Sequence, residues 1–160
     1  MDLSDLVKTL SDVLRMKQLR ICCAESCTGG LVCSLITDLA GSSDIFDRGF
    51  VTYSNQSKID LLGVSQAILN QFGAVSAECA AAMALGALKN SEADLALSIT
   101  GIAGPSGGSA EKPVGLVYFG FARRQSEVVV AQINLPGERQ DIRFAAARAA
   151  LELVLNKIGE

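Results

Sequence analysis

The sequence contains no histidine and no tryptophan, and aromatic residues make up only 5% of its 160 residues. Without histidine, the chain has no Ser-His-Asp triad, no Cys-His pair, no His-ligated metal and no imidazole general base. An enzyme built from this chain therefore takes its base from a carboxylate, a lysine, a tyrosine or a metal hydroxide.

An excess of positive charge is also absent. Lys and Arg number 14 against 17 Asp and Glu, which gives a net charge of −3, so we expect no nucleic-acid partner. No apolar run reaches the roughly 18 residues of a membrane-spanning helix. The opening MDLSDLVKTL lacks the basic start and apolar stretch of a signal peptide. We expect a cytoplasmic protein with no membrane partner.

The chain has five cysteines, and four of them crowd into one short segment. They are Cys22, Cys23, Cys27, Cys33 and Cys79. Because the neighbours Cys22 and Cys23 would point to opposite faces of a strand, the pattern favours reduced thiols over a disulfide framework. Without a histidine or a second Cys pair, the spacing of Cys23 and Cys27 is a poor zinc pattern. We expect buried thiols and no metal.

Hydrophobic residues make up 49% of the chain, enough for a substantial core, and their periodicity predicts alternating helices and strands. Strands are predicted at 21–24, 49–53, 94–100, 114–121 and 127–133. Helices are predicted at 3–14, 31–39 and 142–153, after an N-cap at 54–55, and after N-caps at Ser65 and Ser76. We expect one domain, residues 1–160, in the α/β class. Its predicted architecture is a three-layer α/β/α sandwich with a mostly parallel, mixed sheet of about five strands.

Three polar clusters follow predicted strands, at 25–30, 53–58 and 100–108. Ligands of α/β sheets gather at the carboxyl ends of the strands, so the clusters predict a ligand site. Ser26 in the first cluster stands at a strand-to-helix turn, where it is either a nucleophile or an N-cap. Cys27 is an alternative nucleophile, but no histidine is present to hold its thiolate.

Lys58 in the second cluster is either a solvated lysine or a general base. At an unperturbed pKa of ~10.4 only about 0.04% of a lysine is neutral at pH 7, so a base role requires burial or a neighbouring cation. The glycines from Gly101 onward form either a ligand-binding loop or a plain turn. Arg139 and Arg143, one helical turn apart, suit either a phosphate or a solvated face.

Together these segments resemble one family. The motifs AESCTGG at 24–30, GSS at 41–43, VTYSN at 51–55 with Lys58, GAVS at 73–76, TGIAGP at 100–105, GGS at 107–109 and KPVG at 112–115 are similar to the CinA C-terminal domain family. The resemblance covers nearly the whole chain in the same order. Glu138 and Ser106 both stand where the family commonly has an aspartate. Longer members carry a further N-terminal domain, which the resemblance implies is absent here.

The resemblance implies hydrolysis of the carboxamide of nicotinamide mononucleotide, without cofactor or metal. It implies Ser26 as nucleophile and Lys58 as base, in a homodimer whose substrate is a pyridine mononucleotide. The pocket and oxyanion positions would come from Cys27, Thr28, Gly29, Gly30, Tyr53, Thr100 and Gly101, and the phosphate contacts from Ser42, Ser43, Arg139 and Arg143. Two alternatives are a non-catalytic sensor of pyridine nucleotides and an amidase for another small amide.

Overall fold

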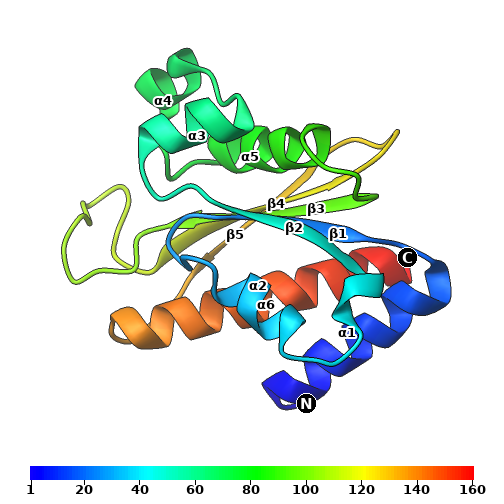
Figure 1. Cartoon of the computed structure of the whole chain (residues 1–160). Helices are drawn as coiled ribbons and strands as arrows, with labels where there is room; N and C mark the ends of the chain where they lie inside the picture. Colours follow the sequence, from blue (N-terminus) through cyan, green and yellow to red (C-terminus); the bar gives the residue numbers. More distant parts are fainter.

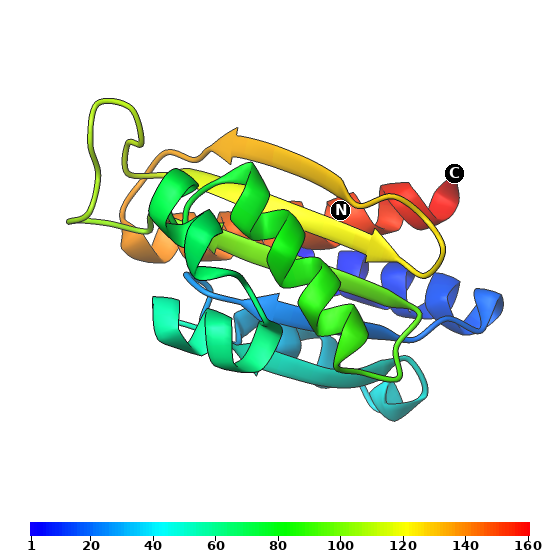
Figure 2. The same cartoon turned by 90° about the horizontal axis from the view of Figure 1, so that it is seen from above.

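The computed structural model describes all 160 residues as a five-stranded sheet between two layers of helices (Figures 1 and 2). The strands are β1 (Ile21–Glu25), β2 (Phe46–Val51), β3 (Leu95–Gly101), β4 (Leu116–Arg123) and β5 (Val129–Asn134). One face carries α1 (Leu3–Lys17), α2 (Leu31–Thr37) and α6 (Arg139–Gly159), and the other α3 (Asn55–Leu62), α4 (Gln66–Phe72) and α5 (Ala77–Lys89). The predicted three-layer α/β fold is confirmed. No helix is both long and apolar enough to cross a membrane.

The sheet is mixed, with the strand order β2-β1-β3-β4-β5. β1 runs parallel to both β2 and β3, whereas β4 is antiparallel to its neighbours β3 and β5. The predicted hairpin is therefore present as β4 and β5, and every strand except β4 runs in the same direction. The carboxyl ends of β1, β2 and β3 consequently meet at a single edge of the sheet.

The second strand lies earlier than predicted, at Phe46–Val51 instead of 49–53. Phe46 already pairs with Ile21 of β1, so the strand begins where the 3-10 helix η1 (Ser42–Asp44) ends. β1 and β3 are buried along nearly their whole length, whereas β2 and β5 are only partly buried. The latter two are edge strands, of which one side has no neighbour to cover it.

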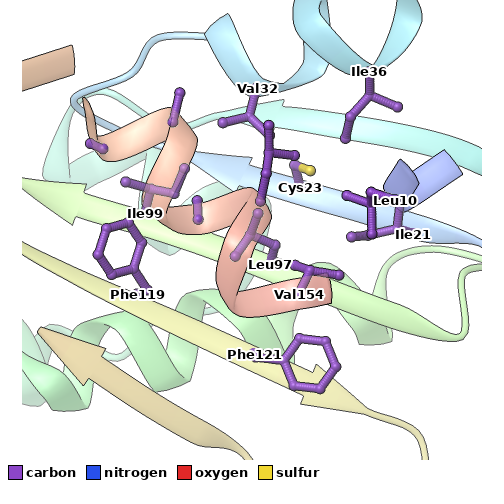
Figure 3. Packing of buried hydrophobic residues seen from close by; sticks show 14 of the residues in the cluster. Leu10, Ile21, Cys23, Val32, Ile36, Leu97, Ile99, Phe119, Phe121 and Val154 are labelled. Atoms are coloured by element: carbon purple, nitrogen blue, oxygen red, sulfur yellow. The ribbon is translucent and has the colours of Figure 1, made fainter. Parts of the chain in front are cut away.

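Large and small side chains divide between the two faces of the central strands. Leu97, Ile99, Phe119 and Phe121 belong to a core of 24 buried residues shared with α1, α2 and α6 (Figure 3). On the opposite face Ser98 donates its hydroxyl hydrogen bond to the carbonyl of Ala80 in α5, at 2.6 Å. The small side chains there let α5 lie directly on the sheet.

Serine side chains begin the three helices on that second face. Ser54, Ser65 and Ser76 each accept a hydrogen bond from a backbone N–H in the first turn, which caps α3, α4 and α5 in turn. The predicted caps at Ser65 and Ser76 are therefore confirmed. Because α3 starts four residues after β2 ends, it lies beside the carboxyl edge of the sheet and brings Lys58 to it.

Candidate functional site

A cavity of about 260 Å³ opens at the edge of the sheet where β1, β2 and β3 end. Its wall is formed by Ser26, Cys27, Tyr53, Asn55, Lys58, Ala74, Val75, Thr100, Gly101, Ala103 and Arg139. Each of the three polar clusters identified in the sequence contributes residues to this wall. Their convergence follows from the parallel pairing of β1 with β2 and β3, which puts three consecutive strand ends side by side.

Ser26 and Lys58 meet at the inner end of this cavity. Lys58 Nζ lies 3.0 Å from Ser26 Oγ, within hydrogen-bond distance, although the two residues are 32 positions apart in the chain. Lys58 Nζ also donates to the carbonyl oxygens of Thr52, at 2.8 Å, and Tyr53, at 3.5 Å. Both side chains are buried, with 1% of Lys58 and 8% of Ser26 exposed.

Burial changes the proton affinity of Lys58. Removing an ammonium ion from water penalises its charged form, and this desolvation lowers the pKa of Lys58 below its ordinary value of 10.5. When neutral, the amine can still donate two N–H bonds to the carbonyls of Thr52 and Tyr53. Its lone pair is then free to face Ser26 Oγ. This geometry is that of a base beside a hydroxyl nucleophile.

Glu25 anchors the turn that carries Ser26, a function that the sequence reasoning missed. Its side chain is fully buried, and its two carboxylate oxygens accept the backbone N–H groups of Val32, at 2.9 Å, and Cys33, at 3.0 Å. These donors belong to the first turn of α2, whose N-cap Gly30 has no side chain to satisfy them. A carboxylate at the end of an apolar strand was the available signal.

The Cys27 side chain is packed in the core below the site and is only 6% exposed. Burial raises the pKa of the Cys27 thiol to about 11, so the sulfur is protonated at neutral pH. A thiol is a far weaker nucleophile than a thiolate. The alternative in which Cys27 attacks the substrate therefore loses its chemical basis.

Arg139 and Arg143 lie on one face of α6 but contact different parts of the site. Arg139 lines the cavity, donating to the carbonyl of Gly104 at 2.7 Å and to the Tyr53 hydroxyl at 3.0 Å. Arg143 donates instead to the carbonyls of Cys27, at 3.1 Å, and Thr28, at 2.9 Å. Of the two arginines, only Arg139 is thus placed at the cavity.

Thr100 and Gly101 line the cavity as the end of β3, and the Thr100 hydroxyl donates to the carbonyl of Ala74 at 2.8 Å. Thr28, Gly29 and Gly30 lie in the turn behind Ser26 and do not form part of the cavity wall. The sequence reasoning had not included Asn55, Ala74, Val75 or Ala103 among the site residues. Only Asn55 carried a signal, as a polar residue inside the second cluster, and apolar wall residues have none.

The structure does not bring Ser42 and Ser43 to this cavity, which corrects the prediction that they contact a phosphate there. They form η1 directly before β2, whereas the cavity lies after β2. A six-residue strand spans about 20 Å, so the two serines lie at the opposite edge of the sheet. In the sequence, the small polar residues before β2 looked as much like a ligand-binding segment as the polar cluster after it.

The cavity holds no set of metal ligands, since no group of three or more Cys, Asp or Glu side chains is arranged around a common point anywhere in the chain. The arrangement offers a hydroxyl, a buried amine, backbone dipoles and one exposed guanidinium. These groups can carry out nucleophilic substitution at a carbonyl carbon.

Comparison with known proteins places the chain in a family. The family model "CinA C-terminal domain" matches residues 3–158. Nicotinamide-nucleotide amidohydrolase PncC of Enterobacter agglomerans is 51% identical over 97% of this chain and 94% of its own length, and PncC of Escherichia coli K12 is 47% identical over 94% and 92%.

Longer proteins contain the same domain. A putative competence-damage inducible protein of Caldicellulosiruptor bescii is 49% identical over 91% of this chain, which spans about a third (35%) of that protein. The crystal structure of the competence/damage inducible protein CihA from Agrobacterium tumefaciens superposes with a TM-score of 0.96 at 45% identity, over 100% of this chain and 97% of the other. On both sequence and structure, the chain belongs to the CinA C-terminal domain family.

Proposed function

We propose that the protein hydrolyses the carboxamide of nicotinamide mononucleotide, giving nicotinic acid mononucleotide and ammonia. The observation that carries the proposal is the 3.0 Å approach of Lys58 Nζ to Ser26 Oγ inside a cavity. Two relatives of nearly equal length, 51% and 47% identical, are named nicotinamide-nucleotide amidohydrolases. The substrate is inferred from the relatives' names, and the reaction type is inferred from the contact between Lys58 and Ser26.

The first half of the reaction acylates Ser26. Neutral Lys58 accepts the hydroxyl proton while Ser26 Oγ attacks the carboxamide carbon, and the carbonyl oxygen becomes an oxyanion held by backbone N–H groups near Ser26. The tetrahedral intermediate then collapses. Its C–N bond breaks as Lys58 returns the proton to the departing nitrogen, which leaves as ammonia.

The second half releases the acid. A water molecule gives a proton to Lys58 and attacks the acyl carbon, and the ester bond to Ser26 breaks with return of the proton to Ser26 Oγ. One water is consumed and one ammonia is formed. The same lysine thus serves as base and acid in both halves. A carboxylate with an ordinary pKa of ~4 would be a much weaker base toward the serine hydroxyl.

Arg139 is the group we assign to the phosphate. It is exposed at the mouth of the cavity, and its guanidinium carries a full positive charge beside the inner pocket where the carboxamide reacts. Phosphate is a favoured ligand of arginine because the planar fork matches two of its oxygens. The homodimer implied by the family resemblance and the cytoplasmic location expected from the sequence remain predictions.

The test of the proposal is the release of ammonia by purified variants. Ser26→Ala removes the nucleophile and Lys58→Ala removes the base, so each should lower kcat by at least about 10³-fold, as loss of a nucleophile or its base does in other hydrolases. Ser34→Ala and Lys89→Ala, which change the same residue types at exposed positions, serve as matched controls and should retain wild-type turnover.

Three outcomes would contradict the proposal. Near-normal turnover in Ser26→Ala or Lys58→Ala would show that the proposed serine–lysine mechanism is wrong. Saturable binding of nicotinamide mononucleotide without ammonia release by the wild type would make the protein a sensor. Equal turnover of free nicotinamide, the riboside and the mononucleotide would show that the phosphate is not recognised and that Arg139 has no such role.

A further inference from the structure

The turn after Ser26 contains two buried backbone N–H groups without an acceptor. Neither Cys27 N nor Thr28 N donates a hydrogen bond to another residue of the protein, although Thr28 is 0% exposed and Cys27 6% exposed. Buried backbone donors are almost always paired. Two adjacent exceptions directly after Ser26, Cys27 in the cavity wall and Thr28 directly behind it, indicate donors kept free for a ligand atom.

The direction of each free N–H is set by the carbonyl of its own peptide unit. In a trans peptide the C=O and N–H point in opposite directions. The carbonyl of Ser26 accepts from Gly29 N at 3.0 Å, which turns the Cys27 N–H the other way. The carbonyl of Cys27 accepts from Arg143 Nε at 3.1 Å, which does the same for the Thr28 N–H.

Arg143 approaches this turn from one side of the sheet only. It comes from α6, on the face with α1 and α2, whereas Lys58 comes from α3 on the other face (Figure 1). The carbonyl of Cys27 points at Arg143, so the Thr28 N–H points away from α6 and toward the Lys58 side. That is the side on which Ser26 Oγ meets Lys58 Nζ.

The helix α2 is not the source of the oxyanion donors. Its first-turn N–H groups at Val32 and Cys33 are bound by the carboxylate of Glu25. Gly29 N is used within the turn by the Ser26 carbonyl. Apart from Gly30 N, the backbone N–H groups of this segment after Thr28 are therefore not available to bind the oxyanion.

We propose that Arg143 is a positioning residue that aims the backbone N–H groups of Cys27 and Thr28 at the oxyanion of the reacting carboxamide. The inference deepens the proposed amide hydrolysis and rests on it. A guanidinium on the Cys27 carbonyl also polarises that peptide, which makes the Thr28 N–H a stronger donor. With Nε and Nη2 both engaged by carbonyls, Arg143 serves the turn and not the phosphate.

The experiment compares three variants on the same helix. Arg143→Met removes the guanidinium, Arg143→Lys keeps the charge but loses the two-pronged contact, and Arg148→Met makes the same change at an arginine that contacts only Met1 and Glu152. For Arg143→Met we expect kcat to fall by about 10²-fold, as when an oxyanion donor is lost, with KM within about threefold of wild type. Arg143→Lys should fall between, and Arg148→Met should match the wild type.

A second readout isolates the oxyanion site. Pyridine-3-boronic acid forms a bond from boron to Ser26 Oγ, the Ser26 proton passes to Lys58, and the tetrahedral boron places an oxygen where the oxyanion forms. Its inhibition constant should rise in Arg143→Met by the same factor as kcat falls. If Arg143 were only structural, its removal would instead lower the melting temperature and leave the inhibition constant unchanged.

The possible outcomes separate cleanly. Unchanged kcat in Arg143→Met would place the donors elsewhere, in the loop from Gly101 to Gly104, and overturn the inference. A raised KM with unchanged kcat would make Arg143 a phosphate ligand and also overturn it. If Arg143→Met does not fold, a reduced kcat in a folded Arg143→Lys with unchanged KM still supports it, and wild-type kcat there contradicts it. Absence of turnover in the wild type instead defeats the proposed function itself.

Discussion

Lys58 is held where its charge is unfavourable. Its side chain is buried, and desolvation lowers its pKa, while the carbonyls of Thr52 and Tyr53 keep its nitrogen hydrogen-bonded. Folding therefore makes this amine a better base at neutral pH than a lysine in water, because a larger fraction is unprotonated. In a chain without histidine, this is how a base active near neutral pH can arise.

The pH dependence of turnover should follow Lys58. Because the proposed mechanism uses the neutral amine, kcat/KM should rise with pH through the lowered pKa of Lys58, which lies below 10.5, and then level off. The measurement is a pH–rate profile of ammonia release at low substrate concentration. A rate that falls as the pH rises from acid to neutral would contradict a lysine base.

Stability supplies an independent check on the same pKa, with a definite sign. Between the lowered folded pKa of Lys58 and 10.5, the unfolded chain binds more protons than the folded chain, so this group makes the protein more stable as the pH rises. Below the folded pKa its destabilising effect is fully present. In urea unfolding, wild type should gain stability relative to Lys58→Met as the pH rises across this window, and a constant difference would show that the pKa is not lowered.

Residues differ in how far the sequence alone could assign them. Ser26 and Lys58 stand in recognisable motifs, and the structure brings them together. The contacts of Glu25 and Arg143 could not be predicted, since each depends on which backbone groups the folded turn presents. For Arg143 the residues alone left a phosphate and a solvated face both open, because a pair of arginines on a helix looks the same whether it faces solvent, an anion or carbonyls.

Among the elements, α3 matters most for the site because it carries Lys58. Its carboxyl end packs on α5 so closely that a Cβ added at Gly86 would lie 1.9 Å from the carbonyl oxygen of Leu62. Leu62 is one helical turn beyond Lys58. The position of Lys58 therefore depends on the absence of a side chain in a different helix.

Gly86→Ala should displace α3 and weaken both stability and activity. Overpacking of this kind costs about 1–3 kcal/mol, and the movement of Lys58 relative to Ser26 should lower kcat more than KM. Urea unfolding and ammonia release measure the two effects. Gly159→Ala is the matched control, because nothing lies within 4 Å of the added Cβ, and it should change stability by less than about 0.5 kcal/mol. A stable and fully active Gly86→Ala would refute this account of the helix contact.

Helices were easier to predict than the edges of the sheet. The caps at Ser65 and Ser76 appear where expected because a cap is a local interaction between residues three apart. The start of β2 was misplaced because an edge strand is only half-covered, so its residues lack the continuous apolar pattern of β1 and β3. Which strand becomes an edge is decided by the topology, which no local pattern reveals.

At the scale of the whole molecule, many of the charged side chains bind other groups within the protein. Arg124 donates to the carbonyls of Ala93, Leu88 and Ser91, and Arg20 pairs with Asp47. With a net charge of −3, few cations remain to form a continuous basic surface. The absence of a basic surface can be tested directly with nucleic acid.

We predict that the protein does not bind duplex DNA at physiological salt. Proteins that bind DNA non-specifically have dissociation constants of about 10⁻⁴–10⁻⁶ M, and their binding is driven by the release of counterions. Gel retardation with protein at about 10⁻⁵ M should show no complex, and lower salt should not produce one. A complex that dissociates as salt is added would reveal a basic surface that the charge distribution does not indicate.

Ser26 and Lys58 reach their contact from opposite sides of the sheet. The turn with Ser26 leads into α2 and is held by Arg143 of α6, whereas Lys58 belongs to α3 on the other layer. The reaction therefore depends on how the two layers are registered across the sheet, and not on either layer alone. Under the proposed mechanism, a variant that kept both hydrophobic cores but shifted one layer by about 1 Å would be folded and would lose about 10²-fold in turnover. The proposed turnover thus depends on core side chains that do not line the cavity.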